Sequence, residues 1–275
     1  MLVFPNCKIN VGLLVKAKRP DGYHNIETVF YPVQWTDALE MVPSNEFKFE
    51  QEGLHIPGDP DNNIIIQAYQ LLKKQYDISP VHCILQKHIP VGAGLGGGSA
   101  NAAFAIKALN DLFELNLSNK ELKKLVSQLG ADCSFFIDNQ PLFASGIGDQ
   151  FEEIDLSLKD KQIIVVYPRS AINTAWAYTQ LKFDQKELPS PKQVVKQPIE
   201  EWKEQLRNDF EREVVKVLPA VKSTKNAYYE AGALYASMSG SGSSIYGIFE
   251  EDIDLEPIKK SVDNDGFKIY SGKLQ

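Results

Sequence analysis

The chain has 275 residues, of which 43% are hydrophobic and 24% charged, and its formal net charge is −7. This length allows two ordinary domains with sizeable cores, and the composition is typical of a globular protein without an apolar run as long as a membrane span. The acidic balance argues against nucleic acid as the main partner, because phosphate backbones bind to basic faces. We therefore expect neither a nucleic-acid nor a membrane partner, and any anionic ligand must be bound by a local feature of the chain.

The cysteine content and the N-terminus indicate a cytoplasmic protein. The chain has three cysteines, Cys7, Cys83 and Cys133. An odd number without C-x-x-C spacing argues against both a disulfide framework and a zinc site, so we expect reduced thiols. Lys8, Asn10 and Gly12 interrupt the early apolar stretch, which therefore lacks the pattern of a signal peptide.

The first predicted strand, residues 8–15, carries polar side chains at its start. Its apolar residues alternate with Lys8, Asn10 and Gly12, as expected of a strand with two different faces. A lysine and an asparagine that point the same way beside a glycine are typical either of a binding site or of a solvated outer face. This segment alone leaves both interpretations open.

A turn and a returning strand follow. Residues 19–22, Arg-Pro-Asp-Gly, predict a tight turn, and residues 23–33 predict the strand that returns from it. Tyr23 and His24 lie at the start of this strand, where they could either contact a ligand or pack against the turn. Residues 38–50 then predict a second hairpin, with a Pro-Ser-Asn turn between its strands.

A helix and a strand precede the most distinctive part of the chain. Asn62 or Asn63 can cap a helix over residues 64–76, whose apolar residues share one face. Residues 81–89 alternate between apolar and polar side chains, which predicts a half-solvated antiparallel strand.

The most informative stretch is a glycine-rich loop over residues 90–103, which reads Pro-Val-Gly-Ala-Gly-Leu-Gly-Gly-Gly-Ser-Ala-Asn-Ala-Ala. Its glycines allow positive φ and a close approach of the backbone to another group, at an entropic cost that packing alone would not require. Ser99 can cap the following helix, whose first turn offers unpaired N–H groups and the positive end of the helix dipole. Loop and helix together therefore predict an anion site, most economically a phosphate site.

Other glycine-rich patterns fit this loop less well. A Walker A motif would require lysine where Gly98 stands. Gly92, Gly94 and Gly97 match the dinucleotide pattern G-x-G-x-x-G, but the preceding segment does not resemble a buried parallel strand. A flexible surface linker is a further alternative, although linkers seldom run straight into a strongly patterned helix.

Asp132 is a second candidate for chemistry. Residues 118–121, Ser-Asn-Lys-Glu, are a capping box and predict a helix that ends at Gly130. Asp132 follows between Ala131 and Cys133 and before two phenylalanines, so it is an acid among apolar residues just outside a helix end. An ordinary loop or cap aspartate is the alternative interpretation.

The second half of the chain predicts an antiparallel sheet with helices on one face. The expected strands are residues 163–167, 234–238, 244–249 and 267–271. The expected helices are residues 174–181, capped by Asn173, and residues 198–210, 219–231 and 256–265. Their order predicts a split βαβ arrangement, whereas residues 184–198 predict only a loop.

Taken together, these motifs resemble a known family. The loop from Pro90 to Ala103 resembles a signature of the GHMP kinases, the small-molecule kinases that include galactokinase, homoserine kinase and mevalonate kinase. The resemblance spans nearly the whole chain and also rests on residues 7–13, 19–24, 27–28, 61–64, 129–132, 146–149, 172–178 and 238–244.

The resemblance implies an α+β fold of two domains with the active site between them. Residues 1–155 would form an ATP-binding domain like ribosomal protein S5 domain 2. Residues 156–275 would form a ferredoxin-like, split βαβ domain that binds the substrate.

The resemblance also implies a reaction and a set of site residues. The motifs are most similar to those of family members that use ATP with Mg²⁺ to phosphorylate the 2-hydroxyl of a cytidine diphosphate sugar alcohol, a small-molecule substrate of the non-mevalonate route to isoprenoid precursors. Asp132 would accept the proton of the attacking hydroxyl, and Lys8 would orient that aspartate and stabilise negative charge. Ser99 is a possible Mg²⁺ ligand.

The remaining implied contacts fall into two groups. ATP would contact Asn63, Lys87, Pro90, Val91, Gly92, Ala93, Gly94, Leu95, Gly96, Gly97, Gly98, Ser99 and Ala100. The sugar alcohol would contact Asn10, Tyr23, His24, Tyr178, Ser239 and Gly240.

Two other functions remain open at this point. One is a kinase of the same fold that acts on another small alcohol, such as homoserine, mevalonate or its phosphate. The other is an ATP-binding sensor without catalysis, which would have no use for Lys8 and Asp132 together.

Overall fold

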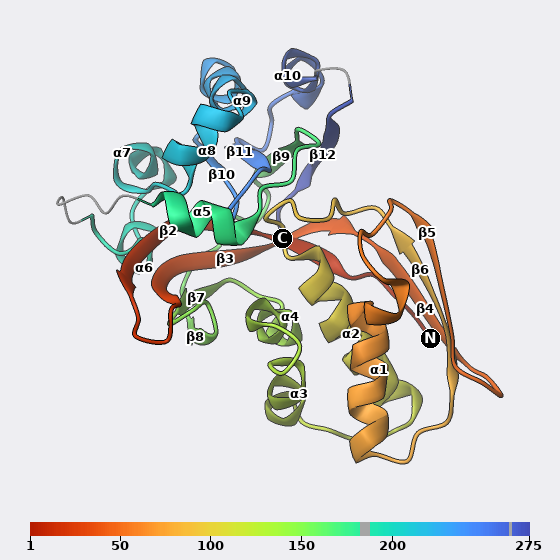
Figure 1. The fold of residues 1–275 in the computed structure, drawn as a ribbon. Coiled ribbons are helices and arrows are strands. Elements are labelled where there is room, and N and C mark those ends of the chain that lie inside the picture. The colour runs from red at the N-terminus through yellow and green to blue at the C-terminus, as the bar shows by residue number, and fades with distance from the viewer. Residues whose placement is uncertain (182–187, 264–265) are drawn as a thin grey trace. The chain divides into compact units, whose positions relative to one another are not determined.

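The computed structural model describes residues 1–181, 188–263 and 266–275. The chain forms two compact units, each assembled from several segments (Figure 1). Unit 1 comprises Met1–Cys7, Trp35–Val91 and Gly96–Gln140, and unit 2 comprises Lys8–Gln34, Gly92–Leu95 and Pro141–Gln275. The glycine-rich loop therefore has its middle in unit 2 and its two ends in unit 1, and the predicted domain boundary after residue 155 stays a prediction.

Unit 1 contains a four-stranded sheet in the order β1-β4-β6-β5. Its strands are β1 (Leu2–Val3), β4 (Ala38–Pro43), β5 (Lys48–Gly53) and β6 (Val81–Lys87). The hairpin predicted over residues 38–50 is wrong, because β6 lies between β4 and β5, antiparallel to the first and parallel to the second. Every second side chain of β6 is buried, which suits a central strand, whereas β5 is largely exposed and suits an edge.

Helices complete unit 1. They are η1 (Pro60–Asn62), α1 (Ile64–Gln75), α2 (Gly97–Leu112), α3 (Asn119–Val126), η2 (Ala131–Ser134) and α4 (Phe135–Asp138). α1 and α2 lie side by side (Figure 1). Asn63 caps α1 as predicted, since its Oδ1 accepts a hydrogen bond from the N–H of Ile65 at 2.9 Å.

Two helix ends differ from the sequence prediction. α2 begins at Gly97 after Gly96, which has a φ of 69°, so Ser99 lies inside the first turn and is not the cap. Glycine at 97 and 98 adopts helical dihedrals without a side-chain cap, which moves the start of the helix toward the loop. α3 has the predicted capping box but ends at Val126, before Gly130.

Unit 2 contains two sheets. The first has the order β2-β3-β7-β8 and is formed by β2 (Asn6–Lys18), β3 (His24–Thr36), β7 (Leu142–Ser145) and β8 (Gln150–Glu153). Most of β2 and β3 belongs to this unit. The predicted turn between them is confirmed, since the N–H of Gly22 donates to the carbonyl of Arg19 at 3.1 Å.

The second sheet confirms the predicted split βαβ arrangement. It is antiparallel throughout, in the order β10-β11-β9-β12, with β9 (Gln162–Tyr167), β10 (Tyr235–Met238), β11 (Ile245–Phe249) and β12 (Lys268–Lys273). α9 (Ala220–Glu230) and α10 (Leu255–Val262) pack together over one face (Figure 1). Residues 264–265 of the predicted last helix lie outside the described residues.

The segment before α9 is less helical than predicted. Residues 198–210 form only η3 (Ile199–Glu201) and α7 (Trp202–Gln205), because the chain then becomes extended along β2. There the N–H of Leu13 donates to the carbonyl of Arg207 at 2.8 Å, and the N–H of Asp209 donates to the carbonyl of Leu13 at 2.9 Å. Such long-range pairing is invisible to helical periodicity.

The described residues of unit 2 form three further short helices. α8 (Glu211–Val217) was not predicted. α5 (Thr174–Gln180) is capped by Asn173 as predicted. α6 (Pro191–Val194) lies within the predicted loop 184–198, of which residues 184–187 lie outside the described residues.

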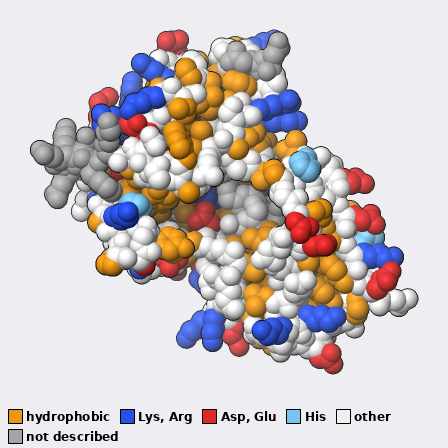
Figure 2. Space-filling model, in the orientation of Figure 1, with side chains coloured by type: hydrophobic (Ala, Val, Ile, Leu, Met, Phe, Trp, Pro, Cys, Tyr) orange, Lys and Arg blue, Asp and Glu red, His pale blue; other side chains and the backbone are white. Residues whose placement is uncertain are grey.

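The surface carries no broad field of one charge on the face in view. Figure 2 shows Lys and Arg side chains interspersed with Asp and Glu over this face. Across residues 1–181, 188–263 and 266–275, no helix combines the length and the apolar character that crossing a membrane requires.

Candidate active site

The first turn of α2, in unit 1, presents backbone N–H groups of the kind that bind anions. The N–H groups of Gly97, Gly98 and Ser99 lie at the start of the helix, where no partner exists within the helix itself. A Cβ on Gly97 would lie 2.9 Å from Ile89 Cγ2, whereas a Cβ on Gly98 would meet no atom within 4 Å. Glycine at 97 is therefore required by packing, and the space at Gly98 fits a phosphate beside the positive end of the helix dipole.

Asn63 and Lys87, both predicted to contact ATP, are largely buried. Asn63 is 8% exposed and uses its Oδ1 to cap α1, so its Nδ2 is the atom left for a nucleotide. Lys87 is 2% exposed, and its ammonium pairs with the carboxylate of Asp37. Burial lowers the pKa of Lys87, and Asp37 opposes that shift. Its ammonium thus belongs to the interior of unit 1.

Asp132 lies in η2, directly before α4, and its surroundings match the predicted apolar setting. Cys133, Phe135 and Phe136 are fully buried, while Asp132 itself is half-buried. A Cβ on Gly130 would lie 3.3 Å from Cys133 Sγ and 3.9 Å from Ser99 Oγ, so the segment that carries Asp132 packs against the first turn of α2.

The same burial determines the protonation state of the Cys133 thiol. Burial raises the pKa of Cys133 to about 11, so this thiol is neutral at pH 7. All three cysteines are buried and none of them forms a disulfide, as predicted. Among the described residues, no group of three or more His, Cys, Asp and Glu side chains could hold a metal ion.

In unit 2, the middle of the glycine-rich loop packs against a second loop. A Cβ on Gly94 would lie 2.1 Å from the carbonyl oxygen of Ser239, and one on Gly240 would lie 3.0 Å from the carbonyl oxygen of Gly94. Ser239 Oγ donates to the carbonyl of Gly94 at 2.9 Å, and the N–H of Ser244 donates to the carbonyl of Ala93 at 3.1 Å. Both loops need glycine because their backbones touch.

Lys8 and Asn10 form a buried polar chain on β2. They are 3% and 2% exposed, so the interpretation of this strand face as solvated is wrong. Lys8 Nζ donates to Asn10 Oδ1 at 2.5 Å and lies 4.5 Å from the centre of the Phe30 ring. Asn10 Nδ2 donates to Thr28 Oγ1 at 3.0 Å, and Thr28 donates to the carbonyl of Gly12 at 2.5 Å. These bonds fix the direction of the Lys8 side chain.

An aromatic cluster follows the turn before β3. The rings of His24 and Tyr178 are stacked, with centroids 4.8 Å apart and an interplanar angle of 18°, and Tyr178 meets Phe210 edge-on at 4.9 Å. Burial, and secondarily Lys18, lowers the pKa of His24, which favours the neutral imidazole. Tyr23 is 60% exposed. Such a cluster offers a planar ligand both a stacking surface and ring nitrogens for hydrogen bonds.

Four buried polar residues that support these sites were not predicted. They are Thr28, Asp37, Asn101 and Asn208. Asn208 Nδ2 donates to the carbonyls of Met238 and Gly240, each at 2.8 Å, and so holds the second loop. Thr28 and Asn101 lie within the motifs that carry the family resemblance, which is a usable signal, whereas Asp37 and Asn208 have partners too distant in sequence for a local pattern.

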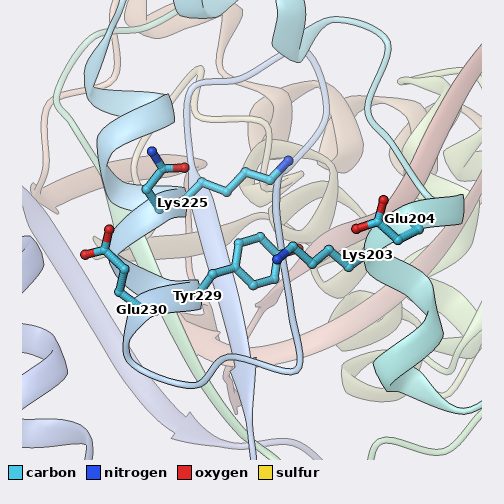
Figure 3. A pocket seen from close by; sticks show the side chains of 6 residues that line it. Lys203, Glu204, Lys225, Tyr229 and Glu230 are labelled. Atoms are coloured by element: carbon cyan, nitrogen blue, oxygen red, sulfur yellow. The ribbon is translucent and has the colours of Figure 1, made fainter.

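A pocket of about 390 Å³ lies between α7 and α9, and none of the predicted site residues lines it (Figure 3). It is lined by Lys203, Glu204, Lys225, Asn226, Tyr229 and Glu230. One of its charges is paired within the chain, because the ammonium of Lys225 lies 2.6 Å from the carboxylate of Glu211. The Lys203 ammonium lies 4.3 Å from the centre of the Tyr229 ring.

Curated kinases that share one name are similar to this chain over most of its length. A 4-diphosphocytidyl-2-C-methyl-D-erythritol kinase of Parabacteroides distasonis is 47% identical over 274 residues, which cover 100% of both chains. The corresponding kinase of Bacteroides thetaiotaomicron is 50% identical over 92% of this chain and 93% of its own.

Solved structures and family models are also similar to this chain. The crystal structure of a 4-(cytidine 5'-diphospho)-2C-methyl-D-erythritol kinase matches with a TM-score of 0.84 and 27% identity, covering 100% of this chain and 99% of its own. Mevalonate kinase from Methanococcus jannaschii shares the fold, with a TM-score of 0.73 at 14% identity and coverage of 100% and 98%. The family models of the GHMP kinases N terminal domain and the GHMP kinases C terminal match residues 63–147 and 192–268. This chain belongs to the GHMP kinase family.

Proposed function

We propose that this chain transfers the terminal phosphoryl group of ATP to the 2-hydroxyl of 4-diphosphocytidyl-2-C-methyl-D-erythritol, in the non-mevalonate route to isoprenoid precursors. The observation that carries the proposal is the 47% identity to a curated kinase of that name over the full length of both chains. The fold supports it, since the solved kinase of the same substrate superposes with a TM-score of 0.84.

ATP is assigned to the glycine-rich loop and the first turn of α2. The open backbone at Gly98 and the helix N-terminus suit the phosphates. The adenine is assigned to Asn63 Nδ2 and to the backbone at Lys87, because the ammonium of Lys87 is engaged by Asp37. Mg²⁺ would neutralise phosphate charge when bound, with Ser99 as the protein ligand and phosphate and water oxygens as the others.

Asp132 is assigned as the general base and Lys8 as the cation of the reaction. A half-buried carboxylate can accept the proton of the attacking hydroxyl. The Lys8 ammonium, held by Asn10, would stabilise the negative charge that develops during transfer, and its fixed direction means that little reorganisation is needed. Positioning and electrostatics of this kind account for most of the rate enhancement in phosphoryl transfer.

The cytidine end of the substrate is assigned to the aromatic cluster. A neutral His24 can both donate and accept hydrogen bonds along a base edge, and Tyr23 and Tyr178 provide rings for stacking. Asn10, Ser239 and Gly240 complete the proposed substrate contacts. A cytoplasmic location, without a nucleic-acid or membrane partner, belongs to the same proposal, and cysteines that form no disulfide suit a reducing compartment.

The decisive experiment measures ATP-dependent phosphorylation by the purified protein. We expect turnover of 4-diphosphocytidyl-2-C-methyl-D-erythritol and none of homoserine or mevalonate. Asp132→Asn should lose most of kcat, about a hundredfold or more, while it still binds ATP. Turnover of another alcohol would overturn the substrate assignment, full activity of Asp132→Asn would overturn the base, and ATP binding without any turnover would favour a sensor.

A further inference from the structure

The motif of the glycine-rich loop contains a buried side chain that the anion site does not use, Asn101. It lies on α2, one turn beyond Gly97, and is 2% exposed. Its Nδ2 donates a hydrogen bond of 2.8 Å to Oδ2 of Asp37, which is fully buried between β3 and β4. Two residues far apart in the sequence therefore meet in the interior of unit 1.

The carboxylate of Asp37 accepts hydrogen bonds from both ends of the glycine-rich loop. Before the loop, Oδ1 accepts from the N–H groups of His88 at 2.7 Å and Ile89 at 2.8 Å. On α2, Oδ2 accepts from Asn101, and it also accepts from the ammonium of Lys87, which precedes the loop. Hydrogen bonds to a charged acceptor are among the strongest in proteins, especially where water is excluded. One carboxylate thus connects the two ends of the loop.

Lys87 lies directly against the start of the helix. A Cβ on Gly97 would lie 3.1 Å from Lys87 Nζ and 2.9 Å from Ile89 Cγ2. The ammonium is therefore next to the end of α2 that already carries the positive end of the helix dipole. The negative charge of the Asp37 carboxylate offsets the repulsion between the Lys87 ammonium and this end of the helix. It thereby keeps the first turn of α2 close to the end of β6.

We propose that Asp37 and Asn101 are positioning residues for the nucleotide. Together they fix the position of the first turn of α2, which begins at Gly97, relative to Ile89. They thereby orient the N–H groups that would bind the phosphates. Both oxygens of the Asp37 carboxylate already accept hydrogen bonds from groups of the chain itself, so the proposal assigns these side chains to the loop and not to the nucleotide. The proposal rests on the proposed function, since it takes ATP as the ligand of the loop.

The test compares two asparagines on the same helix. Asn101→Ala removes the hydrogen bond to Asp37. Asn110→Ala is the matched control, because Asn110 is also buried on α2, at 9% exposed, but its Oδ1 accepts from the N–H of Leu117 at 2.9 Å, away from the loop. Both variants should have lower melting temperatures.

Calorimetric titration with ADP and Mg²⁺ separates a positioning role from a structural one. We expect Asn101→Ala to raise the Kd about tenfold and Asn110→Ala to leave it unchanged. In steady state, Asn101→Ala should raise the KM for ATP but not the KM for the alcohol. Asp37→Asn should weaken binding further, because its amide would face the Lys87 ammonium and the Asn101 amide. Equal Kd values for the two asparagine variants, or an unchanged Kd in Asn101→Ala, would overturn the proposal.

The two proposals fail in different ways. Weaker ADP binding by Asn101→Ala in a protein that phosphorylates none of the alcohols would support the positioning role and overturn the proposed function. Normal turnover of the cytidyl alcohol together with an unchanged Kd for ADP in Asn101→Ala would overturn the positioning role alone. If Asp37→Asn does not fold, the comparison of Asn101→Ala with Asn110→Ala still decides the question.

Discussion

Thr28→Val tests whether the direction of the Lys8 ammonium depends on a chain of buried hydrogen bonds. The substitution removes one hydroxyl and preserves the shape of the side chain. In the native protein this hydroxyl accepts from Asn10 Nδ2 at 3.0 Å and donates to the carbonyl of Gly12 at 2.5 Å, and Thr28 is fully buried. Valine would leave one buried donor and one buried acceptor without partners.

The expected magnitude follows from those two orphaned groups. Leaving one buried polar group unsatisfied costs about 1–3 kcal/mol, so the loss of two partners should lower the free energy of unfolding by about 2–6 kcal/mol. For a chain of this size, at about 2 °C per kcal/mol, such a loss corresponds to a melting temperature about 4–12 °C lower. The freed Asn10 amide can rotate away from Lys8, so kcat should fall roughly tenfold or more, because a misplaced cation stabilises the transition state poorly.

Thermal unfolding and steady-state kinetics, run well below the melting temperature of the variant, measure both effects. Thr28→Ser is the matched control, because it keeps the hydroxyl and loses only a methyl group. It should be destabilised by about 1 kcal/mol and should retain its kcat. If Thr28→Val kept the native kcat despite the expected loss of stability, the argument that Asn10 and Thr28 orient Lys8 would be refuted.

Two further predictions concern the glycine-rich loop and the aromatic cluster. Gly97→Ala should lower the melting temperature, because its Cβ would lie 2.9 Å from Ile89 Cγ2, whereas Gly98→Ala should keep it and raise the KM for ATP. Equal losses of stability would contradict the space assigned at Gly98. His24→Ala should raise the KM for the cytidyl substrate about tenfold and leave the KM for ATP unchanged, and equal changes would argue against its contact with cytosine. Because the pKa of His24 is lowered, its imidazole is neutral at pH 7, and the KM for the cytidyl substrate should rise only as the pH falls below about 6.5. His24→Gln, which does not titrate, should lack this rise.

Local patterns predicted those elements whose partners are close in sequence. Caps formed by Asn63, Ser118 and Asn173 are confirmed, since each acts on an amide within the next three residues. The strands of the second sheet of unit 2 were also predicted, because their apolar runs are bounded by clear turns. The wrong predictions concern segments that pair with parts of the chain far away in the sequence. β6 separates two strands that are neighbours in the sequence, and residues after Gln205 pair with β2 instead of continuing a helix.

In the candidate site, too, features that depend on neighbouring residues were predicted and features that depend on distant residues were not. Glycine spacing in the loop was sufficient to predict a close approach of its backbone to other groups, because the requirement for glycine is local and geometric, whereas the anion site stays a prediction. The polar face of β2 could not be assigned from the strand alone, since burial of Lys8 depends on Phe30 of the next strand. Asp37 could not be recognised as a support of the loop, because its four donors come from residues 87–101.

Ser239 separates two interpretations of the loop over residues 239–243. The family resemblance implies that Ser239 contacts the substrate, but its side chain is fully buried and its hydroxyl donates to the carbonyl of Gly94. A backbone rich in glycine loses much conformational freedom when it becomes ordered, so a loop that binds phosphates through its N–H groups gains affinity from supports that order it beforehand. If Ser239 is such a support, Ser239→Ala should raise the KM for ATP several-fold and change the KM for the cytidyl substrate little. If Ser239→Ala instead raised the KM for the cytidyl substrate, Ser239 would be a substrate contact and not a support of the loop.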